Sequence, residues 1–91
     1  VHIREVIEMA MKHRAVSMIF AHNHPSGDPA PSQSDKDLTR DLIMAAEAVG
    51  LKILDHIVIG DNKYYSFSGE GLTERYEADF KMLKLRNSAS A

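Results

Sequence analysis

The chain has 91 residues, of which 44% are hydrophobic and 26% are charged, as in an ordinary folded protein. This length accommodates one hydrophobic core and makes a second domain unexpected. A formal net charge of −2 provides no general attraction to nucleic acid, and the lack of cysteine excludes disulfides and thiolate metal sites. No apolar stretch is long enough to cross a bilayer and the first residues carry no signal-peptide pattern, so the cytoplasm is the expected location.

The first half of the chain predicts a helix, a strand and a second helix. Apolar residues recur at helical spacing over 3–15, and 16–21 is a short apolar run whose composition suits a strand buried on both faces. Prolines and a glycine exclude regular structure over 24–31. The next helix begins within 32–34 and ends at Gly50. Its predicted apolar stripe consists of Leu38, Leu42, Ala45, Ala46 and Val49.

The second half predicts a β-hairpin and a last helix. Residues 51–59 form the first strand of the hairpin, 60–63 a tight turn, and 64–67 the returning strand. Apolar residues at roughly helical spacing predict a helix over 72–85, and the small polar residues 87–91 are expected to fray. The element order is therefore that of a mixed α/β chain.

One short run, from His22 to Asp35, carries the chemistry of this sequence. His22 and His24 are two residues apart, a spacing that places both imidazoles on the same side of extended backbone. Asp35 falls in the first turn of the predicted second helix, so the end of a strand and the start of a helix can converge on one ion. Two imidazole nitrogens and one carboxylate oxygen are a catalytic zinc ligand set that keeps a position for water.

Parts of this run also have simpler interpretations. Histidines beside prolines and glycines are common in surface loops that bind nothing. Ser32 and Asp35 are spaced as a capping-box-like pair, in which the serine oxygen accepts a backbone N–H at a helix start. The two interpretations of the pair are compatible, because an aspartate in the first turn can bind a cation while the serine caps the helix. Asp28, between glycine and proline, is more simply a turn residue than a ligand.

The spacing His-x-His-Pro-x6-Ser-x-x-Asp, from His22 to Asp35, resembles the JAMM motif of MPN-type zinc metallopeptidases. Its flanks resemble the RadC branch of these proteins, and the resemblance extends over residues 1 to about 72. The flanking stretches are residues 2–5, 21–28, 54–60 and 64–67. The resemblance implies a cytidine deaminase-like α/β fold, a mixed sheet flanked by helices, without the N-terminal strands of the family. Residues 1–71 are then part of a JAMM domain, and residues 72–91 a C-terminal helix and frayed tail.

The resemblance also implies roles for individual residues. His22, His24 and Asp35 match the zinc ligands of the family, and Ser32 matches the serine thought to help hold the oxyanion. The implied cofactor is Zn²⁺, which lowers the pKa of a bound water to about 7 and polarises the scissile carbonyl. The implied reaction is attack of that water on an amide or isopeptide-like bond of a peptide or protein. The general-base glutamate of the family lies well before the histidine pair, at a place upstream of Val1, so we expect zinc binding with feeble hydrolysis.

His56 lies in an otherwise apolar predicted strand, next to Asp55. It can approach the metal site as an outer-shell group or a substrate-facing group, or it can be a hydrogen-bonded core histidine. The sequence leaves these alternatives open.

Two other functions also stay open. The first is a non-catalytic metal-binding or DNA-repair-associated interaction module, although the acidic balance argues against direct binding of nucleic acid by this chain. The second is an iron site with two histidines and one carboxylate, although the positions of Pro25 and Ser32 fit the hydrolase better. No membrane partner is expected. A sheet with so few strands has an exposed edge, at which we expect self-association.

Overall fold

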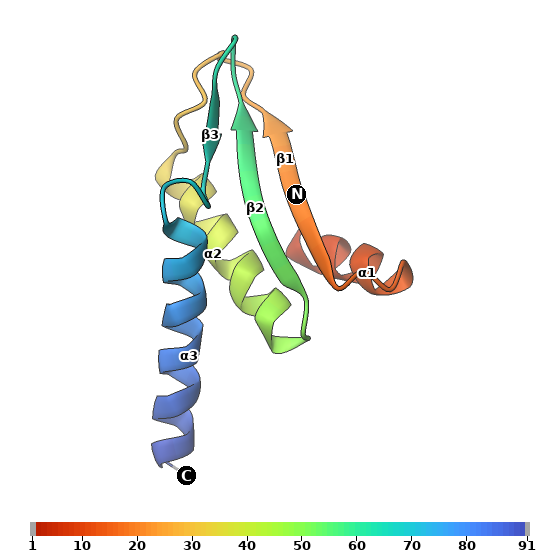
Figure 1. Ribbon diagram of the computed structural model, residues 1–91, viewed down its shortest axis with the longest axis vertical. Coiled ribbons are helices and arrows are strands. Elements are labelled where there is room, and N and C mark those ends of the chain that lie inside the picture. The colour runs from red at the N-terminus through yellow and green to blue at the C-terminus, as the bar shows by residue number, and fades with distance from the viewer. Residues whose placement is uncertain (1, 91) are drawn as a thin grey trace.

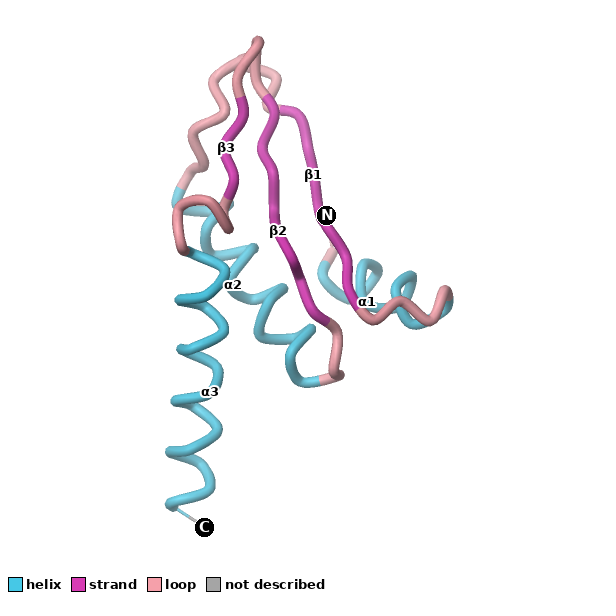
Figure 2. The backbone as a smooth tube through the Cα atoms, in the orientation of Figure 1, coloured by secondary structure: helices cyan, strands magenta, loops and turns pink. Residues whose placement is uncertain are grey.

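The computed structural model describes residues 2–90 and contains a single mixed sheet with helices packed against it (Figure 1). In chain order the elements are α1 (Ile3–Lys12), β1 (Ser17–Asn23), α2 (Gln33–Ala48), β2 (Lys52–Ile59), β3 (Tyr64–Ser66) and α3 (Leu72–Ser90). The strand order is β1-β2-β3, with β1 parallel to β2 and β2 antiparallel to β3. The predicted fold class, a mixed α/β sheet flanked by helices, is confirmed. The longest connection is the loop from β1 to α2 (Figure 2).

The hydrophobic core lies between one face of the sheet and the helices. Val58 and Phe67 are fully buried on that face, and α2 packs against them through Leu42, Ile43 and Ala46. The complete set of buried apolar residues is Ala10, Leu42, Ile43, Ala46, Leu51, Ile53, Val58, Phe67 and Tyr76. All three helices of residues 2–90 contribute to this one cluster, so the described chain folds around a single core.

The apolar stripe predicted for α2 is partly wrong. Val49 is 51% exposed, because it is the C-cap residue and lies beyond the last turn of the helix. Ile43, which the stripe omitted, is buried one position after Leu42. The packed surface of α2 is therefore centred on a line through Thr39, Leu42, Ile43 and Ala46, all of which are buried.

The opposite face of the sheet is open in the described part of the chain. Ile19, Leu54 and Ile59 are 58%, 47% and 43% exposed on it. Along β1 exposed and half-buried residues alternate from Ser17 to Asn23. The expectation that this strand is buried on both faces is therefore wrong, because the helices of residues 2–90 all join the core on the other face.

A register shift decides which residues of β2 face the core. Between Met18 and Ile19 the pairing of β1 with β2 shifts by one, so that Leu54 has no partner on β1. Side chains alternate between the two faces of a strand, and an extra residue reverses the alternation beyond it. His56 and Ile53 consequently both face the core, although in a regular strand this spacing would place them on opposite faces. The shift turns the His56 side chain toward His22, near the end of β1.

Two helix boundaries differ from those predicted. Helix α1 ends at Lys12 and not at residue 15, because Arg14 adopts a left-handed conformation with φ 53°, which a helix cannot continue. Helix α3 continues through Ser90, where fraying was expected after residue 86, and Ala91 lies outside the described residues. Its first turns join the core through Tyr76, whereas its C-terminal part extends beyond the sheet (Figure 1).

Strand β1 forms one edge of the sheet within residues 2–90. Strand β3 forms the other edge, and self-association at an exposed edge of the sheet stays a prediction.

None of the helices within residues 2–90 has both the length and the apolar composition needed to span a bilayer.

Candidate metal centre

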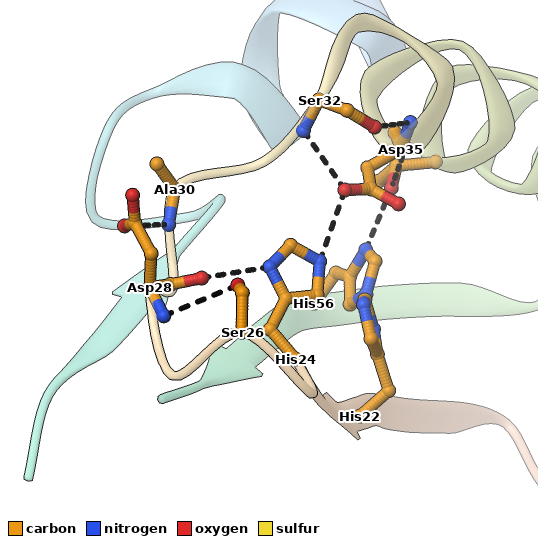
Figure 3. Close-up of polar contacts among 9 residues, drawn as sticks. His22, His24, Ser26, Asp28, Ala30, Ser32, Asp35 and His56 are labelled. Carbon is orange, nitrogen blue, oxygen red and sulfur yellow. Dashed lines mark hydrogen bonds and ion pairs between the residues drawn. The ribbon is translucent and has the colours of Figure 1, made fainter. Parts of the chain in front are cut away.

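Three side chains from successive elements converge at the end of β1. His22 is in β1, His24 is in the loop that follows, and Asp35 is in the first turn of α2. Each offers one ligand atom, and these atoms all lie within 4.8 Å of one another. Figure 3 shows the His24 ring joined to the Asp35 carboxylate by a dashed line, with His22 and His56 beside them. The structure therefore brings together the three residues that the sequence nominated as metal ligands.

The loop between His24 and Ser32 is held against the β2–β3 turn by backbone hydrogen bonds. His24 N–H donates to the carbonyl of Ile59 at 2.9 Å, and Asp61 N–H donates to the carbonyl of Gly27 at 2.8 Å. Gly27 has φ +79°, and a Cβ at this position would lie 2.4 Å from the Asp61 carboxylate. The left-handed backbone favours glycine here, and an added Cβ would in addition displace the Asp61 carboxylate.

A capping box positions the carboxylate of Asp35. The Ser32 hydroxyl accepts the Asp35 N–H at 3.1 Å, and Asp35 Oδ2 accepts the Ser32 N–H at 2.8 Å. Asp35 is thus both a member of the capping box and a candidate ligand, and the two interpretations of this residue from the sequence are compatible. The Ser32 hydroxyl still has its own proton to donate, and the residue is exposed.

The contacts of His24 fit a bound cation. Its Nδ1 lies 2.8 Å from the carbonyl oxygen of Asp28, and because a carbonyl only accepts, Nδ1 carries the proton. In the neutral ring, Nε2 then presents a lone pair to Asp35 Oδ2, 3.2 Å away. Two acceptors at this distance require a proton or a cation between them. Two ligands of a tetrahedral zinc, at bond lengths of about 2 Å, are about 3.3 Å apart. The donor set and the spacing of this pair therefore fit zinc.

His22 is supported from below by His56 of β2. His22 Nδ1 and His56 Nε2 are 2.8 Å apart, and His56 Nδ1 lies 2.6 Å from the Thr39 hydroxyl. The His56 ring stacks on Phe67 with 4.7 Å between ring centroids, and the edge contact with Phe20 measures 5.1 Å. Burial of the ring, and after it the neighbouring His22, lower the pKa of His56 to about 4. His56 is therefore a neutral ring at neutral pH.

The environment of Asp35 favours its ionised form. Burial alone would raise the pKa of this carboxyl group, but hydrogen bonds from the Ser32 backbone and side chain act against it, followed by the nearby His24 and His22. The net result is a pKa below the usual value. Asp35 is thus a carboxylate at neutral pH, as a metal ligand must be.

The other residues considered in the sequence have definite places. His56 is 1% exposed, so it is a hydrogen-bonded core histidine that also contacts His22, and it does not face the surface. Asp28 acts through its backbone carbonyl, and its carboxylate accepts the Ala30 N–H at 3.0 Å as a turn residue does. Thr39 was missed. Its signal was its position four residues after Asp35, one turn further along the same side of α2.

Fold and site together define a small α/β domain with a candidate metal centre of two histidines and one aspartate. The family described as RadC-like JAB domain matches residues 1–72, which is most of the chain. The chain belongs to this family, and the RadC resemblance is confirmed.

Similar proteins include a UPF0758 protein of Trichlorobacter lovleyi, 56% identical over 72 residues, which are 79% of this chain and 31% of that protein. A UPF0758 protein of Desulforamulus reducens is 54% identical over 72 residues, which are 79% of this chain and 32% of that protein. The region of similarity thus spans about a third of the length of these curated relatives. The names of these relatives state no activity.

Proposed function

We propose that this chain is the zinc-binding part of a hydrolase that cleaves an amide or isopeptide-like bond in a peptide or protein. The observation that carries the proposal is the convergence of His22, His24 and Asp35, whose ligand atoms lie within 4.8 Å of one another. Two nitrogens and one oxygen leave a fourth position of a tetrahedral ion for water or substrate. Membership of the RadC-like JAB family supports the same assignment.

The chain's own residues would hold and orient the reacting groups. When bound, zinc supplies an activated water and polarises the scissile carbonyl. His22, His24 and Asp35 would hold the ion, and the exposed Ser32 would donate its hydroxyl proton to the oxygen on which negative charge develops. The Asp35 N–H, which binds the Ser32 oxygen at 3.1 Å, keeps that hydroxyl at the rim of the site.

A general base is the remaining requirement of this chemistry. Glu5 and Glu8 both lie on α1 and are exposed, and Glu8 is paired with Arg4 at 3.0 Å. Neither is assigned as the base. We therefore propose that this chain binds zinc and hydrolyses substrates slowly. We likewise propose that the longer relatives hydrolyse amide or isopeptide-like bonds. A role of this chain in DNA repair and its location in the cytoplasm are also proposed.

Metal content of the purified chain tests the proposal. We expect about one zinc per chain by elemental analysis, with a zinc absorption edge. The variants His22→Ala, His24→Ala and Asp35→Asn should lose the ion, and the exposed His13→Ala should keep it. An unchanged metal content in all three site variants would overturn the assignment, and an iron edge would favour the alternative of an iron site with two histidines and one carboxylate.

A peptide-hydrolysis assay of the same samples tests the catalytic part. We expect slow, chelator-sensitive turnover that His24→Ala abolishes. Rapid turnover would contradict the proposal that this chain hydrolyses substrates slowly. Turnover that a chelator leaves unchanged would contradict a metal-dependent reaction.

A further inference from the structure

A continuous chain of hydrogen bonds runs beneath His22 into the body of the domain. The Thr39 hydroxyl lies 2.8 Å from the carbonyl oxygen of Asp35 and 2.6 Å from His56 Nδ1. His56 Nε2 in turn lies 2.8 Å from His22 Nδ1. The chain therefore connects α2, β2 and β1 and ends on a candidate metal ligand.

When both rings are neutral, only two arrangements of the protons place one donor and one acceptor at each of the two His56 contacts. In the first, the Thr39 hydroxyl donates to the carbonyl of Asp35, its oxygen accepts from His56 Nδ1–H, and His56 Nε2 accepts from His22 Nδ1–H. His22 Nε2 is then left with a lone pair. In the second, Thr39 donates to His56 Nδ1, every later bond reverses, and His22 Nε2 carries the proton. A protonated Nε2 cannot bind a metal ion.

The carbonyl of Asp35 favours the first arrangement. A carbonyl oxygen cannot donate, and at 2.8 Å it takes the single proton that the Thr39 hydroxyl has. The second arrangement would forfeit this hydrogen bond. The first arrangement makes three hydrogen bonds and the second makes two, and because Thr39 is fully buried and His56 is 1% exposed, bulk water does not reach the contact between them.

The aromatic contacts keep the His56 ring in place. Phe67 stacks on one side, with ring planes 6° apart, and Phe20 makes an edge contact at an interplanar angle of 70°. A ring held between these neighbours cannot turn over without displacing them. Its two nitrogens therefore remain directed at Thr39 and His22.

We propose that Thr39 and His56 are positioning residues, which place the ring proton of His22 on Nδ1 and so present Nε2 to the metal ion. The inference rests on the proposed zinc site and adds the residues that determine its ligand tautomer. Hydrogen-bonded partners behind ligating histidines commonly have this role. His24 reaches the same tautomer by another route, since its Nδ1 donates to the Asp28 carbonyl at 2.8 Å.

Long-range ¹⁵N NMR of the metal-free chain, with ¹⁵N in the histidine rings, tests the tautomers directly at mildly alkaline pH. We expect the ring proton of His22 and that of His56 to lie on Nδ1. A His22 ring protonated on Nε2 would overturn the proposal. Because this measurement uses the unsubstituted chain without metal, it remains decisive even if the proposed zinc function fails.

Zinc affinity of matched variants tests the role of the chain of bonds. Thr39→Val preserves the shape of the side chain and removes the hydroxyl, and we expect it to weaken zinc binding about 10- to 100-fold and to mix the His22 tautomers. Thr39→Ser should restore both. Thr73→Val is the control, since it is the same substitution at another buried threonine.

A second variant covers the case in which Thr39→Val does not fold. His56→Phe retains an aromatic ring between Phe20 and Phe67 and removes both nitrogens, and it should weaken zinc binding by a similar factor. Folded Thr39→Val or His56→Phe with the zinc affinity of the unsubstituted chain would overturn the proposal. A chain that binds no zinc at all, yet has the expected tautomers, would reject the proposed function and leave the tautomer assignment standing.

Discussion

The floor and the rim of the metal centre are built in different ways. The floor consists of His22, Thr39 and His56, and its hydrogen bonds join residues 34 and 17 positions apart in the sequence. The rim consists of His24, Ser32 and Asp35, and its contacts include bonds between residues three and four positions apart. The floor depends on how three elements pack. The rim depends on a helix cap that the local sequence encodes. It also depends on a loop that hydrogen bonds tie to the β2–β3 turn.

The two regions also differ in their access to water. His56 and Thr39 are buried, whereas the side chains of His24 and Asp35 are 18% and 23% exposed. A lost hydrogen bond can be replaced by water at the rim but not in the floor. Substitutions in the floor should therefore cost more than substitutions in the rim.

The largest effect is expected from Phe67→Ala, which removes the ring that stacks on His56. Phe67 is fully buried, so the substitution should lower the free energy of unfolding by about 3–5 kcal/mol. Urea denaturation followed by circular dichroism measures this loss in the free energy of unfolding. Tyr64→Ala is the control, because Tyr64 is 72% exposed and should change stability by about 0.5 kcal/mol or less. Similar losses for both variants would contradict a floor that depends on packing.

Zinc should join the floor to the rim, because His22 belongs to one and His24 and Asp35 to the other. At a free zinc concentration of about 100 times the dissociation constant, stabilisation is about 2.7 kcal/mol. Thermal unfolding with zinc and with a chelator measures it. Neither His22→Ala nor Asp35→Asn should respond to zinc. A response that survives in either variant would mean that the floor and the rim do not share the ion.

Gly27→Ala tests how the loop of the rim is anchored. The residue has φ +79°, and an added Cβ would have to displace the Asp61 carboxylate, so the expected loss is about 2 kcal/mol. Gly50→Ala is the matched control, with φ +77° and nothing within 4 Å of an added Cβ, and should lose about 1 kcal/mol. The difference between the urea midpoints of Gly27→Ala and Gly50→Ala measures the cost of the contact between the added Cβ and Asp61. Equal losses would mean that the carboxylate of Asp61 moves aside freely.

The smallest effect is expected from Ser32→Ala, which removes half of the capping box. Loss of an N-cap side chain should cost about 1 kcal/mol, because water can bind the freed Asp35 N–H. Ser34→Ala, in an exposed position of the first turn, is the control. Zinc affinity should fall only slightly in Ser32→Ala, since the Ser32 N–H still binds Asp35 Oδ2. A loss of zinc binding as large as that of Thr39→Val would contradict the distinction between floor and rim.

Two parts of the rim and its strand could be predicted from the sequence because their geometry is local. The two-residue spacing of His22 and His24 on extended backbone and the capping-box spacing of Ser32 and Asp35 each fix neighbouring atoms over a few residues. The strand, the loop with its prolines and the helix start were identified for the same reason, although the exact ends of α1 and α3 were not.

The floor could not be predicted in this way. Thr39 is an ordinary helix residue in the sequence, and it becomes a partner of His56 only because α2 packs on β2. His56 was one of several open alternatives, since a histidine in an apolar strand can face either side of a sheet. The burial of β1 was predicted wrongly because the number of covered faces depends on where the helices pack.

The sequence by itself thus determined the type and order of the elements, the candidate ligands and the cap that holds one of them, because hydrophobic periodicity, turn residues and capping act over short separations. Tertiary structure decided which face of the sheet is covered and which groups lie beneath the metal centre. The covered face depends on where the helices pack. The groups beneath the metal centre depend on the register of β1 on β2, where the unpaired Leu54 reverses the alternation of side chains and turns His56 toward His22.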